Sequence, residues 1–302
     1  MVVRGNNLGI SVSDIVMGRK TFFILPDTSL MPTSYLEDYF ALGYECYYIE
    51  NDKRVKFQKK VDIILSLFKD LILFFNIDFH IPDFEWEYYI QDLVIDHKIQ
   101  DSIGILYTKR ATKEDKARIE KKYLYELGVR CGCTQLEYQK KQNFELIAKL
   151  LFANQAQGRR KTIRALCTSA CTYTVTYGPH QVTSAGVLQD ISLSHFTILS
   201  PGTGLEIKLY EKLKDIHFNI RGFLFRSNAV LVMERPVNGD MLYVFAFVNS
   251  SGTTGLEDRT RSLLIPALYK LLSSNCTALL EQLYVKVDDQ PEITELPQAD
   301  DD

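Results

Sequence analysis

The sequence predicts two folded units, an α/β domain followed by an all-β barrel. In the first half of the chain, short apolar runs alternate with segments that repeat apolar residues every three or four positions. Beyond about residue 165 the period changes to two, as in 172–177, where threonines alternate with aromatic and β-branched residues. The 302-residue length allows two domains, and the content of 46% hydrophobic and 24% charged residues is typical of globular proteins.

Strands and helices are predicted to alternate through the first half. Strands are expected where apolar residues run nearly unbroken, at 21–25, 44–49, 71–77, 103–107 and 129–136. Helices with an apolar stripe are expected at 33–42, 55–69, from 83 onward, 112–127 and 140–155.

Polar residues and glycines mark the expected ends of two helices. Thr33 is placed as the N-cap of one helix, with Gly43 as its C′ residue. Thr112 and Asp115 resemble a capping box, and Gly128 closes that helix. This rhythm predicts a parallel sheet covered by helices on both faces.

In architecture alone, this order resembles a response-regulator receiver. Such a domain uses a carboxylate cluster, a hydroxyl and a lysine after successive strands. Asp27, Asp78 and Thr108 are candidates, but no suitable lysine follows the fifth strand. We therefore expect a domain that is not phosphorylated; the alternative is a receiver labelled at Asp78. A Rossmann nucleotide site is disfavoured because no GxGxxG follows a strand.

The second half predicts a small barrel or sandwich with a helix after it. Its strands are expected at 172–177, 184–191, 195–199, 205–213, 216–226, 229–234 and 241–248, and its capping helix at 256–274.

The six cysteines do not form a metal-binding pattern. Cys131 and Cys133 form a CxC motif without histidines at ligand spacing. Cys167 and Cys171 are four apart in an expected strand, which would place both on one face as buried free thiols. The histidines lack partners at useful spacing, so catalysis is not expected.

Charge and hydropathy limit the partners. The net charge of −3 gives no general basic surface for nucleic acid. The apolar run at 71–77 is too short to cross a bilayer, and the N-terminus lacks the pattern of a signal peptide. We expect a cytoplasmic protein without membrane insertion. The tail from Asp288 holds seven acidic residues and no basic ones, which predicts disorder.

Two polar clusters are candidates for a binding site. The segment 157–164 carries Arg159, Arg160 and Arg164, whose planar guanidinium groups suit phosphate oxygens and guanine edges. Downstream, Asp190-Ile191-Ser192-Leu193-Ser194-His195 offers a carboxylate and a hydroxyl on an expected strand. Together these groups suit a ligand that contains both guanines and phosphates.

These clusters resemble the PilZ family, whose domains bind cyclic di-GMP. Its pattern is RxxxR before a β-barrel and [D/N]xSxxG on an early strand; here Arg160 and Arg164 match the first half. Asp190 and Ser192 match the second, with His195 in place of glycine. The resemblance covers residues 157–275 and implies that Arg159, Arg160, Arg164, Asp190, Ser192 and His195 form the ligand site.

The resemblance also implies a non-enzymatic receptor with no cofactor besides this ligand, acting on an unidentified downstream protein. The alternative is a degenerate PilZ-like interaction module that does not bind nucleotide, suggested by the histidine at 195. The expected organisation is an α/β domain at 1–152, an arginine-bearing linker at 153–164, a barrel with its helix at 165–285, and an acidic tail at 286–302.

Overall fold

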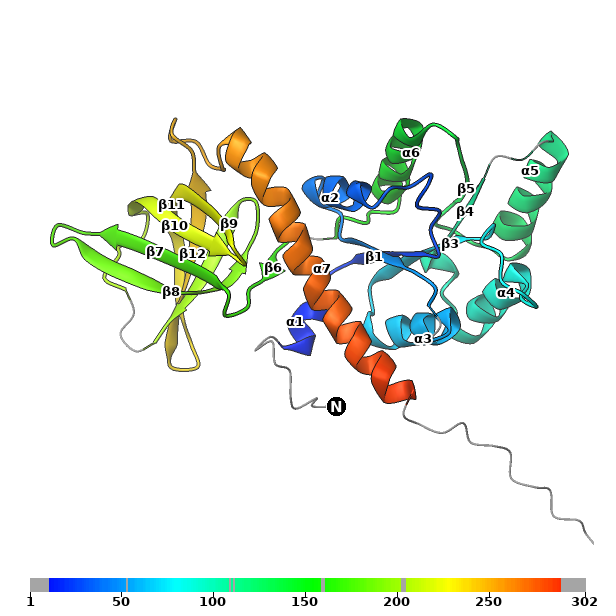
Figure 1. Ribbon diagram of the computed structural model, residues 1–302, viewed down its shortest axis with the longest axis horizontal. Coiled ribbons are helices and arrows are strands. Elements are labelled where there is room, and N and C mark those ends of the chain that lie inside the picture. Colours follow the sequence, from blue (N-terminus) through cyan, green and yellow to red (C-terminus); the bar gives the residue numbers. More distant parts are fainter. Residues whose placement is uncertain are drawn as a thin grey trace, which may run out of the picture.

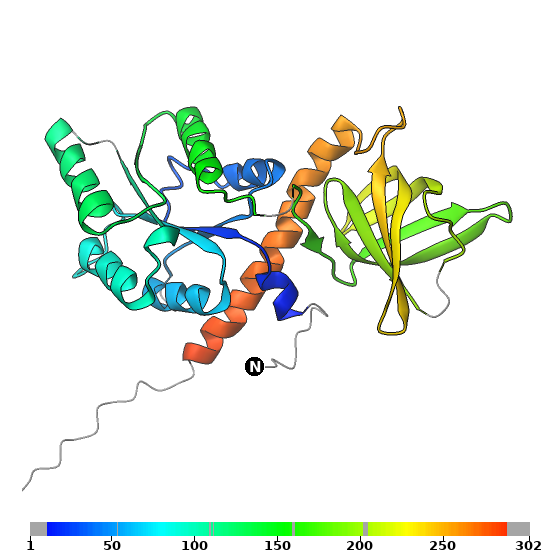
Figure 2. The same ribbon diagram turned by 180° about the vertical axis from the view of Figure 1, so that it is seen from behind.

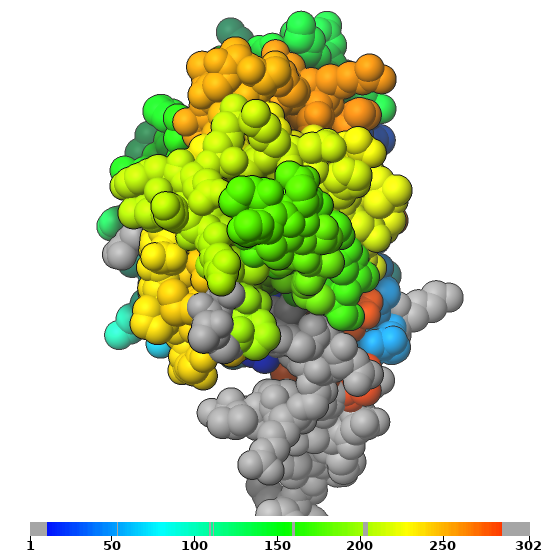
Figure 3. Space-filling model, turned by 90° about the vertical axis from the view of Figure 1, so that its left-hand side faces the viewer, coloured from blue at the N-terminus to red at the C-terminus, as the bar shows by residue number. Residues whose placement is uncertain are grey.

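The computed structural model describes residues 11–52, 54–108, 110, 112–158, 161–201 and 205–288. A parallel sheet with its helices and an antiparallel barrel lie on opposite sides of one long helix, α7 (Asp258–Asp288) (Figures 1 and 2). The predicted fold class, α/β followed by an all-β barrel with a C-terminal helix, is confirmed. Seen from the barrel side, the barrel strands form the near face of the molecule (Figure 3).

The first sheet is wholly parallel, with the order β2-β1-β3-β4-β5. Its strands are β1 (Lys20–Ile24), β2 (Cys46–Ile49), β3 (Leu71–Asn76), β4 (Ile103–Thr108) and β5 (Cys133–Leu136). Every residue of β1 and β3 is buried, because helices cover both faces of the sheet. This order is that of a doubly wound sheet.

Helices connect these strands close to the predicted positions. They are α1 (Val12–Val16), α2 (Ser34–Ala41), α3 (Phe57–Leu67), α4 (Trp86–His97), the 3₁₀ turn η1 (Gln100–Ser102), α5 (Lys113–Glu120), the π-helical η2 (Lys121–Glu126) and α6 (Lys140–Ala153). Before β1, residues Val12–Val16 form α1.

The local geometry confirms some of the predicted element ends. Thr112 accepts a hydrogen bond from the Asp115 amide at 3.1 Å, as a capping residue does. Gly43 and Gly128 have φ of 91° and 70°. Thr33 is the N-cap residue of α2, as predicted, although its side chain makes no capping hydrogen bond. The fifth strand begins at Cys133 instead of residue 129, since Gly132 has a φ of 103°.

The second sheet closes into an antiparallel barrel. Its strands are β7 (Cys171–Tyr177), β8 (Val182–Ile191), β9 (His195–Ser200), β10 (Lys212–Ile220), β11 (Phe223–Val237) and β12 (Asp240–Val248). The pairing of β8 with β9 closes it, and the short β6 (Ala165–Leu166) adds to β8. Inside, the Phe196 ring stacks on Phe245 at 5.0 Å and meets Phe218 edge-on at 4.9 Å.

Several strand boundaries in the barrel were wrongly predicted. The expected strand 216–226 is a hairpin, because Arg221 and Gly222 have φ of 52° and 97° and form a two-residue turn. The expected strand 229–234 is the middle of β11. Most of 205–213 is irregular: Tyr210 has a φ of 67°, and the Leu205 amide donates to the Tyr243 hydroxyl at 2.7 Å.

Cys167 and Cys171 do not share a strand. Cys167 follows β6 and Cys171 begins β7, with a turn between them in which the Cys171 amide donates to the Thr168 carbonyl at 2.9 Å. Both are buried free thiols, as expected, although the predicted reason was wrong.

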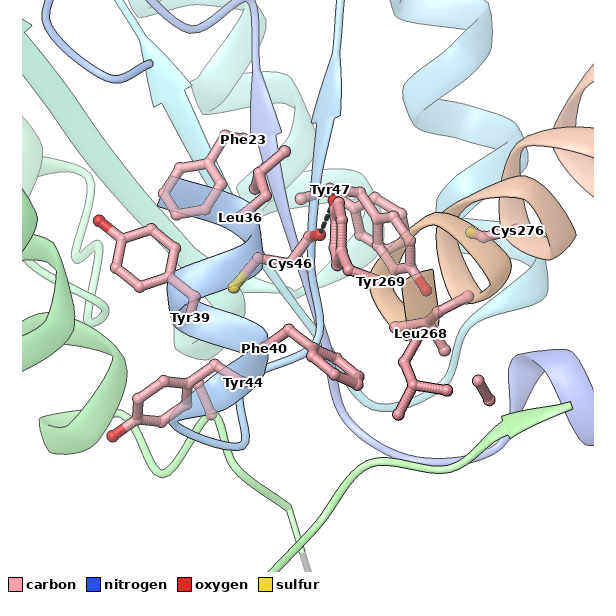
Figure 4. Packing of buried hydrophobic residues seen from close by; sticks show 14 of the residues in the cluster. Phe23, Leu36, Tyr39, Phe40, Tyr44, Cys46, Tyr47, Leu268, Tyr269 and Cys276 are labelled. Atoms are coloured by element: carbon pink, nitrogen blue, oxygen red, sulfur yellow. Dashed lines mark hydrogen bonds between the residues drawn. The ribbon is translucent and has the colours of Figure 1, made fainter. Parts of the chain in front are cut away.

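Helix α7 packs against both units. The Tyr269 hydroxyl donates to the Cys46 carbonyl of β2 at 2.9 Å, and the Asn275 amide donates to the Leu166 carbonyl of β6 at 2.8 Å. Figure 4 shows Tyr269 beside Phe40, and their ring centroids are 6.2 Å apart.

Length and composition alone would allow α7 to cross a membrane, over Asp258–Val285. Several of its apolar side chains are part of the core, and Leu264, Leu268 and Leu271 are fully buried. The helix extends well past the expected end at residue 274. The predicted acidic tail lies outside the described residues from 289 onward, and the domain boundaries remain a prediction.

Candidate functional site

The two polar clusters meet where the segment before β6 reaches the end of β8. Arg164 directly precedes β6, and Leu166 of β6 lies opposite Asp190 of β8. The Arg164 guanidinium approaches the Asp190 carboxylate, with Nη1 to Oδ2 at 3.7 Å and side chains 36% and 13% exposed. The sequence-predicted residues Arg164 and Asp190 are therefore brought together. Arg159 and Arg160 lie outside the described residues.

An irregularity in β8 explains how Asp190 comes to lie beside the arginine. Leu188 and Ile191 are both buried in the barrel, although residues three apart in a regular strand face opposite sides. The pairing with β9 shifts here: Leu188 lies opposite Ile198, but Asp190 lies opposite Thr197. Gln189 is thus an extra residue, a β-bulge, and it lets Asp190 face away from the core.

Ser192 organises the turn between β8 and β9. Its side chain is fully buried, and its hydroxyl accepts from the amides of His195 at 3.0 Å and Ser194 at 3.3 Å. The Ser192 amide in turn donates to the His195 carbonyl at 2.8 Å. The hydroxyl therefore holds the turn in shape, and its role as a donor to a ligand remains a prediction.

His195 occupies the glycine position of the motif as the first residue of β9. Because its backbone is part of a strand paired with Ala246, the position does not need the positive φ that favours glycine. The half-buried ring lies 2.8 Å from the Ser194 hydroxyl through Nδ1. Burial, and then the positive charge of Arg164, lower the pKa of His195. The ring is therefore mainly neutral at pH 7.

Three hydroxyl residues that the motif did not single out complete the site. The Thr162 and Ser194 hydroxyls lie 2.8 Å apart, so the arginine-bearing segment contacts the β8–β9 turn. Thr197 donates to Asp190 Oδ1 at 3.0 Å. Thr162 lies inside the RxxxR segment and Ser194 inside the second cluster, so position alone could have suggested both. Thr197 is identifiable only from strand pairing.

A hollow of about 380 Å³ lies on the barrel along β8 and β9, and Arg164, Asp190 and His195 are not among the residues that line it. Tyr173, Gly186, Leu199 and the bulged Gln189 contribute to its lining. A larger cavity, of about 450 Å³, lies elsewhere, between α2, β2 and α7. The Arg164–Asp190 pair has more specific chemistry than either cavity, because its carboxylate can accept from N–H groups and its guanidinium can donate to anionic oxygens.

The receiver-like edge of the parallel sheet is closed by a polar network. Asp78 forms an ion pair with Arg110 and accepts from the Thr108 amide at 2.6 Å. Burial opposes ionisation of Asp78, but hydrogen bonds from Arg110 and Thr108 lower its pKa. Asp27 instead accepts from the Ser29 amide at 2.9 Å. Within the described residues, no group of three histidine, cysteine, aspartate or glutamate side chains suits a metal ion.

No protein-family profile matches the chain, and no curated protein matches it. Among solved structures, part of it is similar to YcgR from Escherichia coli in complex with c-di-GMP, with 17% identity and a TM-score of 0.31, over 43% of this chain and 50% of that one. The PilZ domain of YcgR with c-di-GMP gives 19% identity and a TM-score of 0.28, over 44% and 99%.

The inhibitor of motility MotI from Bacillus subtilis gives 13% identity and a TM-score of 0.30, over 39% of this chain and 52% of that one. The chain therefore spans about half the length of the YcgR structure. Because these TM-scores are low, the function proposed below rests on the residues and contacts of this chain.

Proposed function

We propose that this chain is a non-enzymatic receptor for cyclic di-GMP, which binds between the arginine-bearing segment and the end of β8. The observation that carries the proposal is the approach of Arg164 to Asp190, 3.7 Å apart, at the junction of the two motif halves. The motif resemblance described above supplies the identity of the ligand.

The chemistry of the groups suits this dinucleotide. The Asp190 carboxylate can accept from the N1–H and N2–H edge of a guanine, and Arg160 and Arg164 can donate to phosphate oxygens or to guanine O6 and N7. Each charge-assisted contact contributes about 1.5–3 kcal/mol. Several such contacts are enough for micromolar affinity after the cost of ordering the segment.

The response to the ligand follows from the position of the segment. Thr162 and Arg164 already contact the barrel. We infer that the ligand draws Arg159 and Arg160 onto the same surface and thereby reorients the N-terminal domain. Because α7 contacts β2 and β6, any such movement must change its packing. An unidentified downstream protein would recognise the new orientation of the N-terminal domain.

Calorimetric titration of the whole chain with cyclic di-GMP tests the proposal. GTP and cyclic di-AMP serve as controls, because the first lacks the second guanine and the second lacks guanine altogether. We expect saturable binding of cyclic di-GMP at micromolar concentration and much weaker binding of both controls. Equal binding of all three nucleotides, or of none, would overturn the proposal.

The second candidate is an interaction module that binds a protein and no nucleotide. Two observations favour it: the Asp190 side chain is only 13% exposed, and the ring of His195 takes up space where the motif has glycine. Under this alternative the Arg164–Asp190 pair only holds β6 against the barrel, and titration with cyclic di-GMP produces no saturable heat.

A further inference from the structure

Thr197 is a polar residue in an unusual environment. It lies in β9, opposite Asp190 on one side and Val244 of β12 on the other. Its side chain is only 2% exposed, which places it among the few buried polar residues of the barrel. Buried hydroxyl groups need a hydrogen-bond partner, and that of Thr197 donates to Asp190 Oδ1 at 3.0 Å.

The bulge at Gln189 makes this contact possible. Without the extra residue, continuing the register from Leu188 and Ile198 would place Gln189 opposite Thr197. With it, the carboxylate and the hydroxyl become direct cross-strand neighbours on one face. The contact between Asp190 and Thr197 thus follows from the bulge in β8. Thr197 belongs to neither half of the sequence motif.

The two oxygens of Asp190 have different neighbours. Oδ1 accepts from the buried Thr197 hydroxyl, and Oδ2 faces the Arg164 guanidinium at 3.7 Å. A β-branched threonine in a strand has a restricted χ1 angle, so its hydroxyl is held in place. A carboxylate anchored through one oxygen presents the other in a defined direction, which reduces the ordering cost of binding.

We propose that Thr197 is a positioning residue of the nucleotide site, which orients the Asp190 carboxylate toward Arg164 and the guanine edge. This inference rests on the proposed function. Thr197 itself, being buried, does not touch the ligand; it acts through Asp190.

Calorimetric titration of the whole chain with cyclic di-GMP, in a double-mutant cycle, tests this role. Thr197→Val removes the hydroxyl with little change in shape, and we expect about tenfold weaker binding, the size of one charge-assisted hydrogen bond. Thr197→Ser keeps the hydroxyl and should bind within about threefold of the wild type. Should Thr197→Val not fold, Thr197→Ala removes the same group and takes its place.

The cycle separates positioning from a merely structural role. If Thr197 acts through Asp190, adding Thr197→Val to Asp190→Asn should weaken binding by less than about twofold more, because the group it orients has already been changed. Losses that multiply in the double variant, or wild-type affinity in Thr197→Val, would overturn the inference and leave the proposed function standing. A wild-type chain that does not bind cyclic di-GMP overturns both.

Discussion

The site depends on a few side chains whose partners are set by strand pairing. Arg164 and Asp190 were predicted from the resemblance to a family motif, which can be recognised in the sequence without knowledge of the fold. Thr162, Ser194 and Thr197 were not predicted: the first two lie within the motif segments and could have been suggested by position, but the contact of Thr197 depends on the bulge at Gln189. A bulge adds one residue and reverses which side chains face the core, and sequence alternation does not locate it.

His195 should make the stability of the chain sensitive to pH. Burial and Arg164 lower its pKa in the folded state, whereas Asp190 opposes this. Well above the ordinary pKa of 6.5 the ring is neutral in both states. As the pH falls through that value, the unfolded chain takes up the proton first, so the free energy of unfolding decreases.

Urea denaturation at several pH values measures this effect. Between about pH 7.5 and pH 5, His195→Gln should lose less stability than the wild type, because glutamine does not titrate. His180→Gln, in the exposed β7–β8 turn, is the matched control and should behave as the wild type does. Equal losses in His195→Gln and the wild type would show that the His195 ring is not the group that responds.

The parallel sheet was the easier element to predict. Its strands are short apolar runs buried on both faces, and its helices carry clear apolar stripes. The secondary structure that the local sequence favours is therefore the one that the tertiary structure contains. The barrel was harder: alternation continues through the hairpin at Arg221 and Gly222, and only the glycine marks the turn. The end of α7 was predicted too early because Ser273, Ser274 and Asn275 have low helix propensity. The helix nevertheless continues to Asp288, because it packs against both units.

The receiver-like edge should not accept a phosphoryl group. Asp78 is held by Arg110 and Thr108, so its carboxylate is engaged by donors. Incubation of the whole chain with acetyl phosphate and magnesium should leave Asp78 unlabelled in intact-mass and peptide measurements. A receiver protein that accepts acetyl phosphate serves as the positive control. Phosphate on Asp78 would contradict this prediction.

At the scale of the whole molecule, α7 joins the barrel to the α/β unit. Asn275 is 3% exposed, and its amide reaches the Leu166 carbonyl, two residues after Arg164. Tyr269 lies nearer the start of the helix and reaches β2. Contiguous contacts through α7 therefore link the Arg164 site to the parallel sheet.

The Asn275 contact should be important for stability. Asn275→Ala leaves the Leu166 carbonyl without its donor, and we expect the free energy of unfolding to fall by about 1–3 kcal/mol. Thr277→Ala, at an exposed position of the same helix, is the control and should change stability by less than about 0.5 kcal/mol. Denaturant unfolding of the two variants compares them directly. Equal stability of Asn275→Ala and the wild type would show that this hydrogen bond does not stabilise the fold.

The central claim is that arginines before the barrel close over a dinucleotide held against Asp190. The most direct measurement is the calorimetric affinity of Arg160→Ala and Arg164→Ala for cyclic di-GMP, with Arg226→Ala as the control. Arg226 is 65% exposed and pairs with Asp215, on strands β11 and β10. Each of the first two variants should bind at least about tenfold more weakly, while Arg226→Ala binds as the wild type does. Unchanged affinity in both Arg160→Ala and Arg164→Ala would contradict the claim.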